Sequence, residues 1–132
     1  MALIVLDASV IVAVLDPADA RHAAAITALR RYAGEDLRVP ASAYAECLTG
    51  PASAGRLADA KRAIRSLVVE VVPLTEYVAE EAAGVRARHP GLRLADALVV
   101  ATASVLDADL ILTGDESWRG VASSVVEVVT PG

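Results

Sequence analysis

The sequence predicts an α/β domain with a mostly parallel sheet, because short apolar runs alternate with longer stretches of helical spacing. Segments such as "LIVL" and "LVVEVV" are apolar throughout, which is typical of parallel strands covered by helices on both faces. Five apolar runs have the length of strands, and we expect them at residues 3–6, 37–39, 68–72, 109–112 and 125–129.

Helical patterns fill the intervals between these runs. A helix is expected to begin near Ser9, another to carry "PASAYAECLTG", a third to occupy residues 94–106, and a short one to end at Trp118. Three apolar stripes at helical spacing indicate further helices; they consist of Ile26, Leu29 and Ala33, then Leu57, Ile64 and Val68, then Val78, Ala82 and Val85.

The composition is that of a globular domain, with 132 residues, 55% hydrophobic and 22% charged. The net charge of −5 argues against a nucleic-acid partner, since phosphate binding normally shows as a basic excess. That objection weakens if several acids gather around cations. Arginine supplies the basic residues except Lys61, and its planar fork suits phosphates.

The location expected from the sequence is the cytoplasm. The single cysteine, Cys47, cannot form an internal disulfide, which fits a reducing compartment. The apolar start has neither a basic leader nor a cleavage pattern, and no run is long enough for a membrane span. With one cysteine and only His22 and His89 as histidines, any metal would be held by oxygen.

An aspartate interrupts the apolar run "LIVLDASVIVAVLD" at residues 3–16. Because an ionised carboxylate is costly to bury without water or a partner, Asp7 must cap a helix, bind a ligand or react. It follows the first strand directly, so an N-cap and a functional role are both open. Ser9 has the same two interpretations, as a cap or as a holder of metal-bound water.

Three more acids stand in apolar surroundings. Glu46 is the only charge in "PASAYAECLTG", and Asp96 is the only charge in residues 94–106. Asp115 follows the fourth strand in "LILTGDESW", with the hydroxyl of Thr113 at the same edge. Taken singly, these acids are an exposed helical glutamate, a first-turn aspartate and a turn residue.

All four acids map to the carboxyl edge of the predicted sheet, where ligands of open parallel sheets bind. If the four acids only capped separate helices or turns, they would have no reason to lie at the same edge of the sheet. Carboxylates within ~4–6 Å repel one another, so such a cluster usually holds cations. Oxygen ligands suit Mg²⁺ or Mn²⁺, and two such ions ~4 Å apart promote phosphodiester hydrolysis. Three arginines could contact flanking phosphates or form a solvated helix face: Arg86, Arg88 and Arg93.

Four segments occur in this order: "LIVLDASVIVAVLD", "PASAYAECLTGP", "LRLADALVVATA" and "DLILTGDESW". They resemble the motifs of the PIN domain, and more closely those of VapC toxins from bacterial type II toxin–antitoxin modules. The resemblance covers essentially the whole chain, so a single domain is expected over residues 1–132.

The resemblance implies a three-layer α/β/α sandwich with a mostly parallel five-stranded sheet, and Mg²⁺- or Mn²⁺-dependent endoribonuclease activity on RNA. It also implies a homodimer and a cognate antitoxin, which we expect to cover the apolar surface around "HAAAITALRRYA", residues 22–33. The family acids fall on Asp7, Glu46 and Asp96 as metal ligands and on Asp115 as an outer ligand or water positioner. The supporting hydroxyls fall on Ser9 and Thr113.

Two other classes of function stay open at this point. A magnesium-dependent phosphotransfer domain of receiver or haloacid-dehalogenase type also places an aspartate after its first strand. Both patterns resemble sites that use a lysine near the phosphoryl group, whereas Lys61 lies in a presumed surface helix, and Ser9 stands where a dehalogenase has its second aspartate. The third class is a module that binds RNA or protein without cutting.

Overall fold

The computed structural model describes residues 1–131 and contains a five-stranded sheet in which every neighbouring pair is parallel. The strands are β1 (Leu3–Leu6), β2 (Asp36–Pro40), β3 (Glu70–Val72), β4 (Leu110–Thr113) and β5 (Val125–Val128). Their order in the sheet is β3-β2-β1-β4-β5. The α/β class and the parallel sheet are therefore confirmed.

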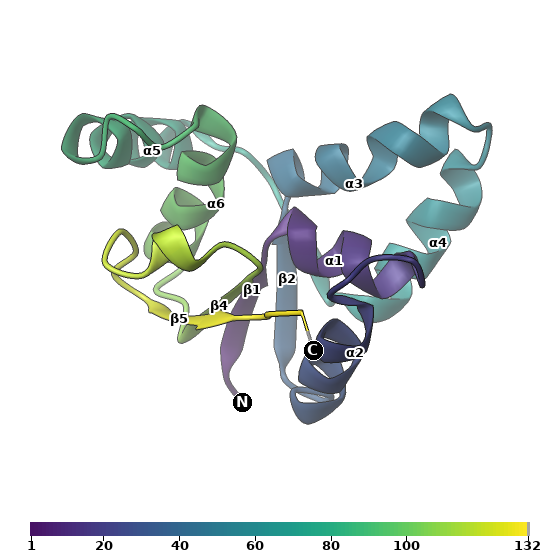
Figure 1. The fold of residues 1–132 in the computed structure, drawn as a ribbon. Coiled ribbons are helices and arrows are strands. Elements are labelled where there is room, and N and C mark those ends of the chain that lie inside the picture. The colour runs from purple at the N-terminus through teal and green to yellow at the C-terminus, as the bar shows by residue number, and fades with distance from the viewer. Residues whose placement is uncertain (132) are drawn as a thin grey trace.

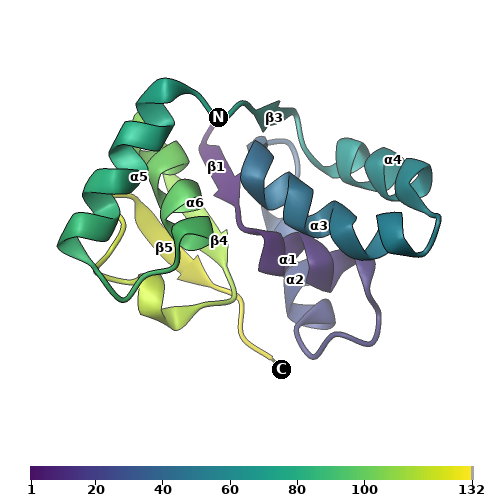
Figure 2. The same ribbon diagram turned by 90° about the horizontal axis from the view of Figure 1, so that it is seen from above.

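Helices cover both faces of this sheet, which confirms the three-layer arrangement (Figures 1 and 2). They are α1 (Ala8–Leu15), α2 (His22–Arg31), α3 (Ala41–Ser53), α4 (Leu57–Leu67), α5 (Glu76–Arg88), α6 (Leu94–Val105) and the 3₁₀ helix η1 (Glu116–Trp118). The pair α5 and α6 lies on one side, α1, α2 and α4 lie on the other, and α3 runs outward from the end of β2 (Figure 1). Right-handed crossovers produce this division, because the chain moves in one direction from β1 to β3 and in the other from β3 to β5.

Some helices and strands begin or end at other residues than the sequence predicts, because hydrogen bonds at the helix ends set these boundaries. The expected strand at residues 68–72 begins only at Glu70, because the amide of Val68 donates to the carbonyl of Ile64 and closes α4. The expected stripe of α2 included Ala33, but α2 ends at Arg31 and Ala33 is exposed. The first strand has the predicted bounds, the second is longer by one residue at each end, the fourth lies one residue later, and the fifth ends one residue earlier.

The core forms around the two central strands. Ile4 and Leu6 of β1 and Ile111 and Leu112 of β4 have no exposed surface, and Trp118 of η1 is equally buried. Ile4 pairs with Leu37 on one side and Leu110 on the other. This packing fixes where β1 and β4 end in the sheet. It therefore also fixes the position of the residues that follow them.

The strand order reverses between β1 and β4, since the chain leaves β1 toward β2 and returns to β4 on its other side. In open parallel sheets a ligand crevice forms beyond the carboxyl ends of the strands at this point. Among residues 1–131, no helix combines the length and the apolar character needed to span a membrane.

Replacing Ile4 with alanine should lower the free energy of unfolding by about 2–5 kcal/mol, because the substitution leaves a cavity at a fully buried position. Urea denaturation measures the change. Val125→Ala on the edge strand is the matched control; its side chain is 68% exposed, and we expect a change within about 0.5 kcal/mol. Equal losses in both variants would contradict the placement of the core.

Candidate functional site

Asp7 is the residue at which β1, α1 and β4 meet. Its amide donates to the carbonyl of Leu112 at 2.9 Å, which continues the pairing of β1 with β4. One carboxylate oxygen, Oδ1, accepts from the amide of Ala8 at 2.8 Å and caps α1. The other, Oδ2, accepts from the hydroxyls of Ser9 at 2.7 Å and Thr113 at 2.9 Å. Asp7 is thus an N-cap and, at the same time, part of a polar network.

The two hydroxyls of that network also bind the loop after β4. Ser9 Oγ accepts from the amide of Gly114 at 3.0 Å, and Thr113 Oγ1 accepts from the amide of Asp115 at 3.1 Å. Thr113 is fully buried, so its hydroxyl is held in this arrangement by the core beneath it. Ser9 and Thr113 therefore fix Asp7 relative to Asp115.

Burial raises the pKa of Asp7, since desolvation of its carboxylate outweighs the hydrogen bonds from Ser9, Thr113 and Ala8, and the negative charge of Asp96 raises it further. The ionised form of Asp7 is consequently disfavoured relative to a carboxyl in water. A cation at this position would reverse that penalty.

Glu46 lies in the second turn of α3 with its side chain exposed. Partial desolvation raises the pKa of Glu46, and the charges of Asp7 and Asp96 raise it as well. The next residue, Cys47, is buried, and burial together with the charges of Asp7 and Glu46 raises the pKa of its thiol to about 12. Cys47 is therefore an uncharged core residue and not a nucleophile.

Asp96 is buried in the first turn of α6, with 9% of its surface exposed. Arg93, the N-cap residue of that helix, binds it through two hydrogen bonds, from Nε to Oδ2 and from Nη2 to Oδ1, both 3.1 Å long. This fork-to-carboxylate pairing is geometrically specific. We did not predict it; the spacing of the two residues, three positions apart at a helix start, is the signal that could have indicated it.

Asp115 sits at the rim of the cluster and caps η1. Its Oδ1 accepts from the amide of Ser117 at 2.9 Å and from the hydroxyl of Ser117 at 2.6 Å. The hydroxyl bond is the main cause of a lowered pKa of Asp115, to which the positive charge of Arg93 adds. Asp115 is thus ionised more readily than a free aspartate, and it is linked to the other acids through Arg93.

The structure brings Asp7 at the N-cap of α1, Glu46 of α3 and Asp96 of α6 close enough that the charge of Asp96 raises the pKa of the other two. Four carboxylates and two hydroxyls give an oxygen-only donor set, whose chemistry fits a hard divalent cation. Within residues 1–131, the structure contains no group of three histidine, cysteine or acidic side chains already positioned to share one ion.

Of the three arginines considered for phosphate contact, Arg93 pairs with Asp96 in the cluster and the other two make contacts elsewhere. Arg86 donates to the carbonyl of Leu92 at 3.1 Å, and Arg88 pairs with Glu81 at 3.6 Å, so both serve the α5–α6 region. Arg21, at the start of α2, instead donates to the carbonyl of Gly114 at 3.2 Å. Sequence reasoning missed Arg21, because nothing in its local pattern indicates a contact 93 residues away.

The contact between Arg21 and Gly114 leaves no room for a side chain at position 114. A Cβ at Gly114 would lie 2.7 Å from Nε of Arg21, so a side chain there would displace the arginine from the loop between β4 and η1. The arrangement gives the site one basic group on its α2 side.

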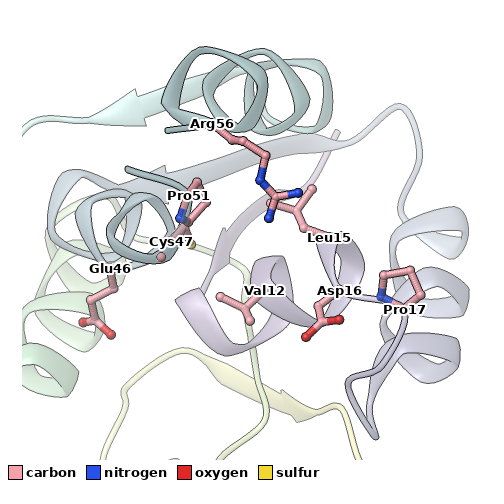
Figure 3. A pocket seen from close by; sticks show the side chains of 9 residues that line it. Val12, Leu15, Asp16, Pro17, Glu46, Cys47, Pro51 and Arg56 are labelled. Carbon is pink, nitrogen blue, oxygen red and sulfur yellow. The ribbon is translucent and has the colours of Figure 1, made fainter. Parts of the chain in front are cut away.

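A hollow of about 690 Å³ opens beside the acids, between α1 and α3. Figure 3 shows Glu46 at one end of it and Asp16 and Arg56 toward the other. Between them the wall is mainly apolar, formed by Val12, Leu15, Pro17, Cys47, Gly50 and Pro51.

Several solved structures share this fold, and among them are a toxin–antitoxin complex and a toxin. The crystal structure of FitAcB from Neisseria gonorrhoeae has 26% identity over 94% of this chain and 96% of that chain, with a TM-score of 0.75. A toxin–antitoxin complex from Klebsiella pneumoniae has 18% identity over 92% and 94%, also with a TM-score of 0.75. VapC20 from Mycobacterium tuberculosis, described as a sarcin-ricin-loop-cleaving toxin, has 21% identity over 89% and 93%, with a TM-score of 0.74.

No curated protein matches the sequence significantly. The family model of the PIN domain, by contrast, matches residues 4–123, which include all four acids and both hydroxyls described above. The resemblance seen in the four sequence segments is confirmed at this level, and the chain belongs to the PIN domain family.

Proposed function

We propose that this chain is a Mg²⁺- or Mn²⁺-dependent endoribonuclease that acts as the toxin of a toxin–antitoxin pair. The observation that carries the proposal is that Asp7, Glu46 and Asp96 lie together at the carboxyl edge of the sheet, where burial and then the negative charge of Asp96 raise the pKa of both Asp7 and Glu46. Gathering carboxylates from the end of β1, from α3 and from α6 is unfavourable, and a bound cation would relieve that cost. Membership of the PIN domain family supports the same conclusion.

In this proposal Asp7, Glu46 and Asp96 hold the cation, with Asp115 as an outer ligand or water positioner. A divalent ion held by these residues would supply a water of lowered pKa and charge stabilisation for the departing oxygen of a phosphodiester. Asp7 is oriented by Ala8, Ser9 and Thr113. Glu46 is exposed, which leaves the substrate side of the cluster open.

RNA is the substrate class that we infer. VapC20, a toxin that cleaves the sarcin-ricin loop, shares the fold of the present chain. Bound cations would offset the net charge of −5 where the phosphates approach, and Arg21 supplies a positive charge at the rim. The phosphotransfer alternative is less well supported, because Lys61 is exposed on α4 and lines a separate hollow with Arg62 and Arg65.

We infer a protein partner of the antitoxin class as well, since the similar solved structures include toxin–antitoxin complexes. The surface that we predict for it is that of residues 22–33, where Ala23 and Thr27 of α2 are exposed. We further propose a homodimer and a cytoplasmic location, in which Cys47 stays a reduced, buried thiol.

The purified chain should cut RNA in the presence of Mg²⁺ or Mn²⁺ and stop cutting when a chelator is added. Asp7→Asn and Asp96→Asn should each lower the cleavage rate by roughly a hundredfold or more, because each removes a proposed metal ligand. Gel analysis of total RNA over time measures this loss.

Asp59→Asn is the control for this experiment, since Asp59 is exposed and pairs with Arg62 on α4. It should cut as the native chain does. Cleavage that persists in Asp7→Asn, or that is indifferent to chelator, would exclude the proposed chemistry; labelling of Asp7 by a phosphoryl donor would support the phosphotransfer alternative.

The crowded acids also predict how the metal-free protein responds to pH. The pKa of Asp7 is raised above 3.8 on folding, so the native state holds the proton more tightly than the unfolded state does. Its contribution to stability is therefore present at low pH and is lost as pH rises through the folded pKa. The free energy of unfolding of Asp7→Asn minus that of the native chain should grow from pH 4 to pH 7 in chelator.

Urea denaturation at several pH values measures that difference. Saturating Mg²⁺ should raise the stability of the native chain, by about 2.7 kcal/mol when its concentration is a hundred times the Kd, and leave Asp7→Asn nearly unchanged. A difference that is constant with pH, together with no response to Mg²⁺, would mean that Asp7 is a structural cap alone.

Expression of the chain by itself should arrest bacterial growth, and co-expression of a cognate antitoxin should restore it, because the partner would mask the acidic cluster. Growth curves of paired strains test this, with Asp7→Asn as the variant that should be harmless alone. Growth arrest by Asp7→Asn equal to that of the native chain would contradict the link between toxicity and the site.

A further inference from the structure

Arg93 is the cation that the acidic cluster contains in the metal-free protein. Its guanidinium engages both carboxylate oxygens of Asp96, at 3.1 Å each. Those bonds raise the pKa of Arg93, and the negative charges of Glu46 and Asp115 raise it further. Three of the four acids therefore act on this one positive charge.

The two partners of this pair are held very differently. The Asp96 side chain is 12% exposed, whereas the Arg93 side chain is 75% exposed. Arg93 is thus anchored by its charge and not by packing, so it can leave the cluster without opening a cavity. Asp96 has no comparable freedom, because it is buried in the first turn of α6.

A divalent ion bound by Asp96 needs at least one of the oxygens that Arg93 occupies, and it repels the guanidinium. We propose that Arg93 is an internal counter-ion, which neutralises Asp96 in the metal-free protein and turns out into solvent when the ion binds. This inference rests on the proposed metal-dependent function. It assigns to Arg93 the role of setting metal affinity, in place of the phosphate contact expected from the sequence.

Competition of this kind weakens metal binding. The native chain must break the Arg93–Asp96 pair before the ion can bind, whereas a chain without the arginine does not. An ion pair with one exposed partner corresponds to a change in affinity of about twofold to fivefold.

Titration calorimetry with Mn²⁺ on the full chain tests the proposal. Arg93→Gln should bind Mn²⁺ about twofold to fivefold more tightly than the native chain, for the reason above. Arg88→Gln is the matched control, since it removes the same charge from a pair with Glu81 outside the cluster. Its affinity should stay within about twofold of the native value. Arg93→Lys keeps the charge but loses the planar fork, and should fall between the native chain and Arg93→Gln.

The second readout is the melting temperature, first in chelator and then with Mn²⁺. In chelator Arg93→Gln should melt at a lower temperature than the native chain, because Asp96 loses its partner, and Mn²⁺ should raise its Tm by more than it raises the native Tm. If the native chain binds Mn²⁺ but Arg93→Gln binds it no more tightly than Arg88→Gln does, the proposed role of Arg93 is wrong and the metal site itself is not contradicted. Absence of Mn²⁺ binding in all four chains would overturn the proposed metal site itself.

Discussion

The carboxylate of Asp7 stands where the apolar centre of the sheet ends, and its desolvation is the constraint around which the site is arranged. Three donors hold it: the first amide of α1, the hydroxyl of Ser9 and the hydroxyl of Thr113. Because Thr113 ends β4, the charge of Asp7 can be held only if β1 and β4 end side by side. The buried packing of these two strands is what secures that alignment.

Capping a helix and binding a cation are usually considered competing explanations for an aspartate after a strand. Here a single residue is arranged for both, since Asp7 caps α1 with Oδ1 and directs Oδ2 toward the loop after β4. The dipole of α1 stabilises the same negative charge that a cation would neutralise. In the proposed function, a cation bound at Asp7 would let this acidic chain approach a polyanion at that edge of the sheet.

Much of the fold follows from the sequence because parallel strands buried on both faces leave a clear pattern, as in "LIVL". Their ends were less predictable: Val68 fits both a strand and a helix, and one backbone hydrogen bond assigns it to the end of α4. The acids were found from their places after strands or at helix starts. The contacts of the arginines were not: the spacing of Arg93 and Asp96 is the one local signal of their pair, and the contact of Arg21 with Gly114 exists only in the folded chain.

The central claim is that these acids form one cation site, and paramagnetic broadening of backbone amide signals by Mn²⁺ tests it most directly. Sub-stoichiometric Mn²⁺ should broaden the amides around residues 7, 46, 96 and 115 first and together, since nuclei near a bound ion relax fastest. Residues 36 and 70, where Arg38 already neutralises both acids, should keep their signals. Broadening that spreads evenly over the acidic surface, or that spares residue 7, would contradict the account.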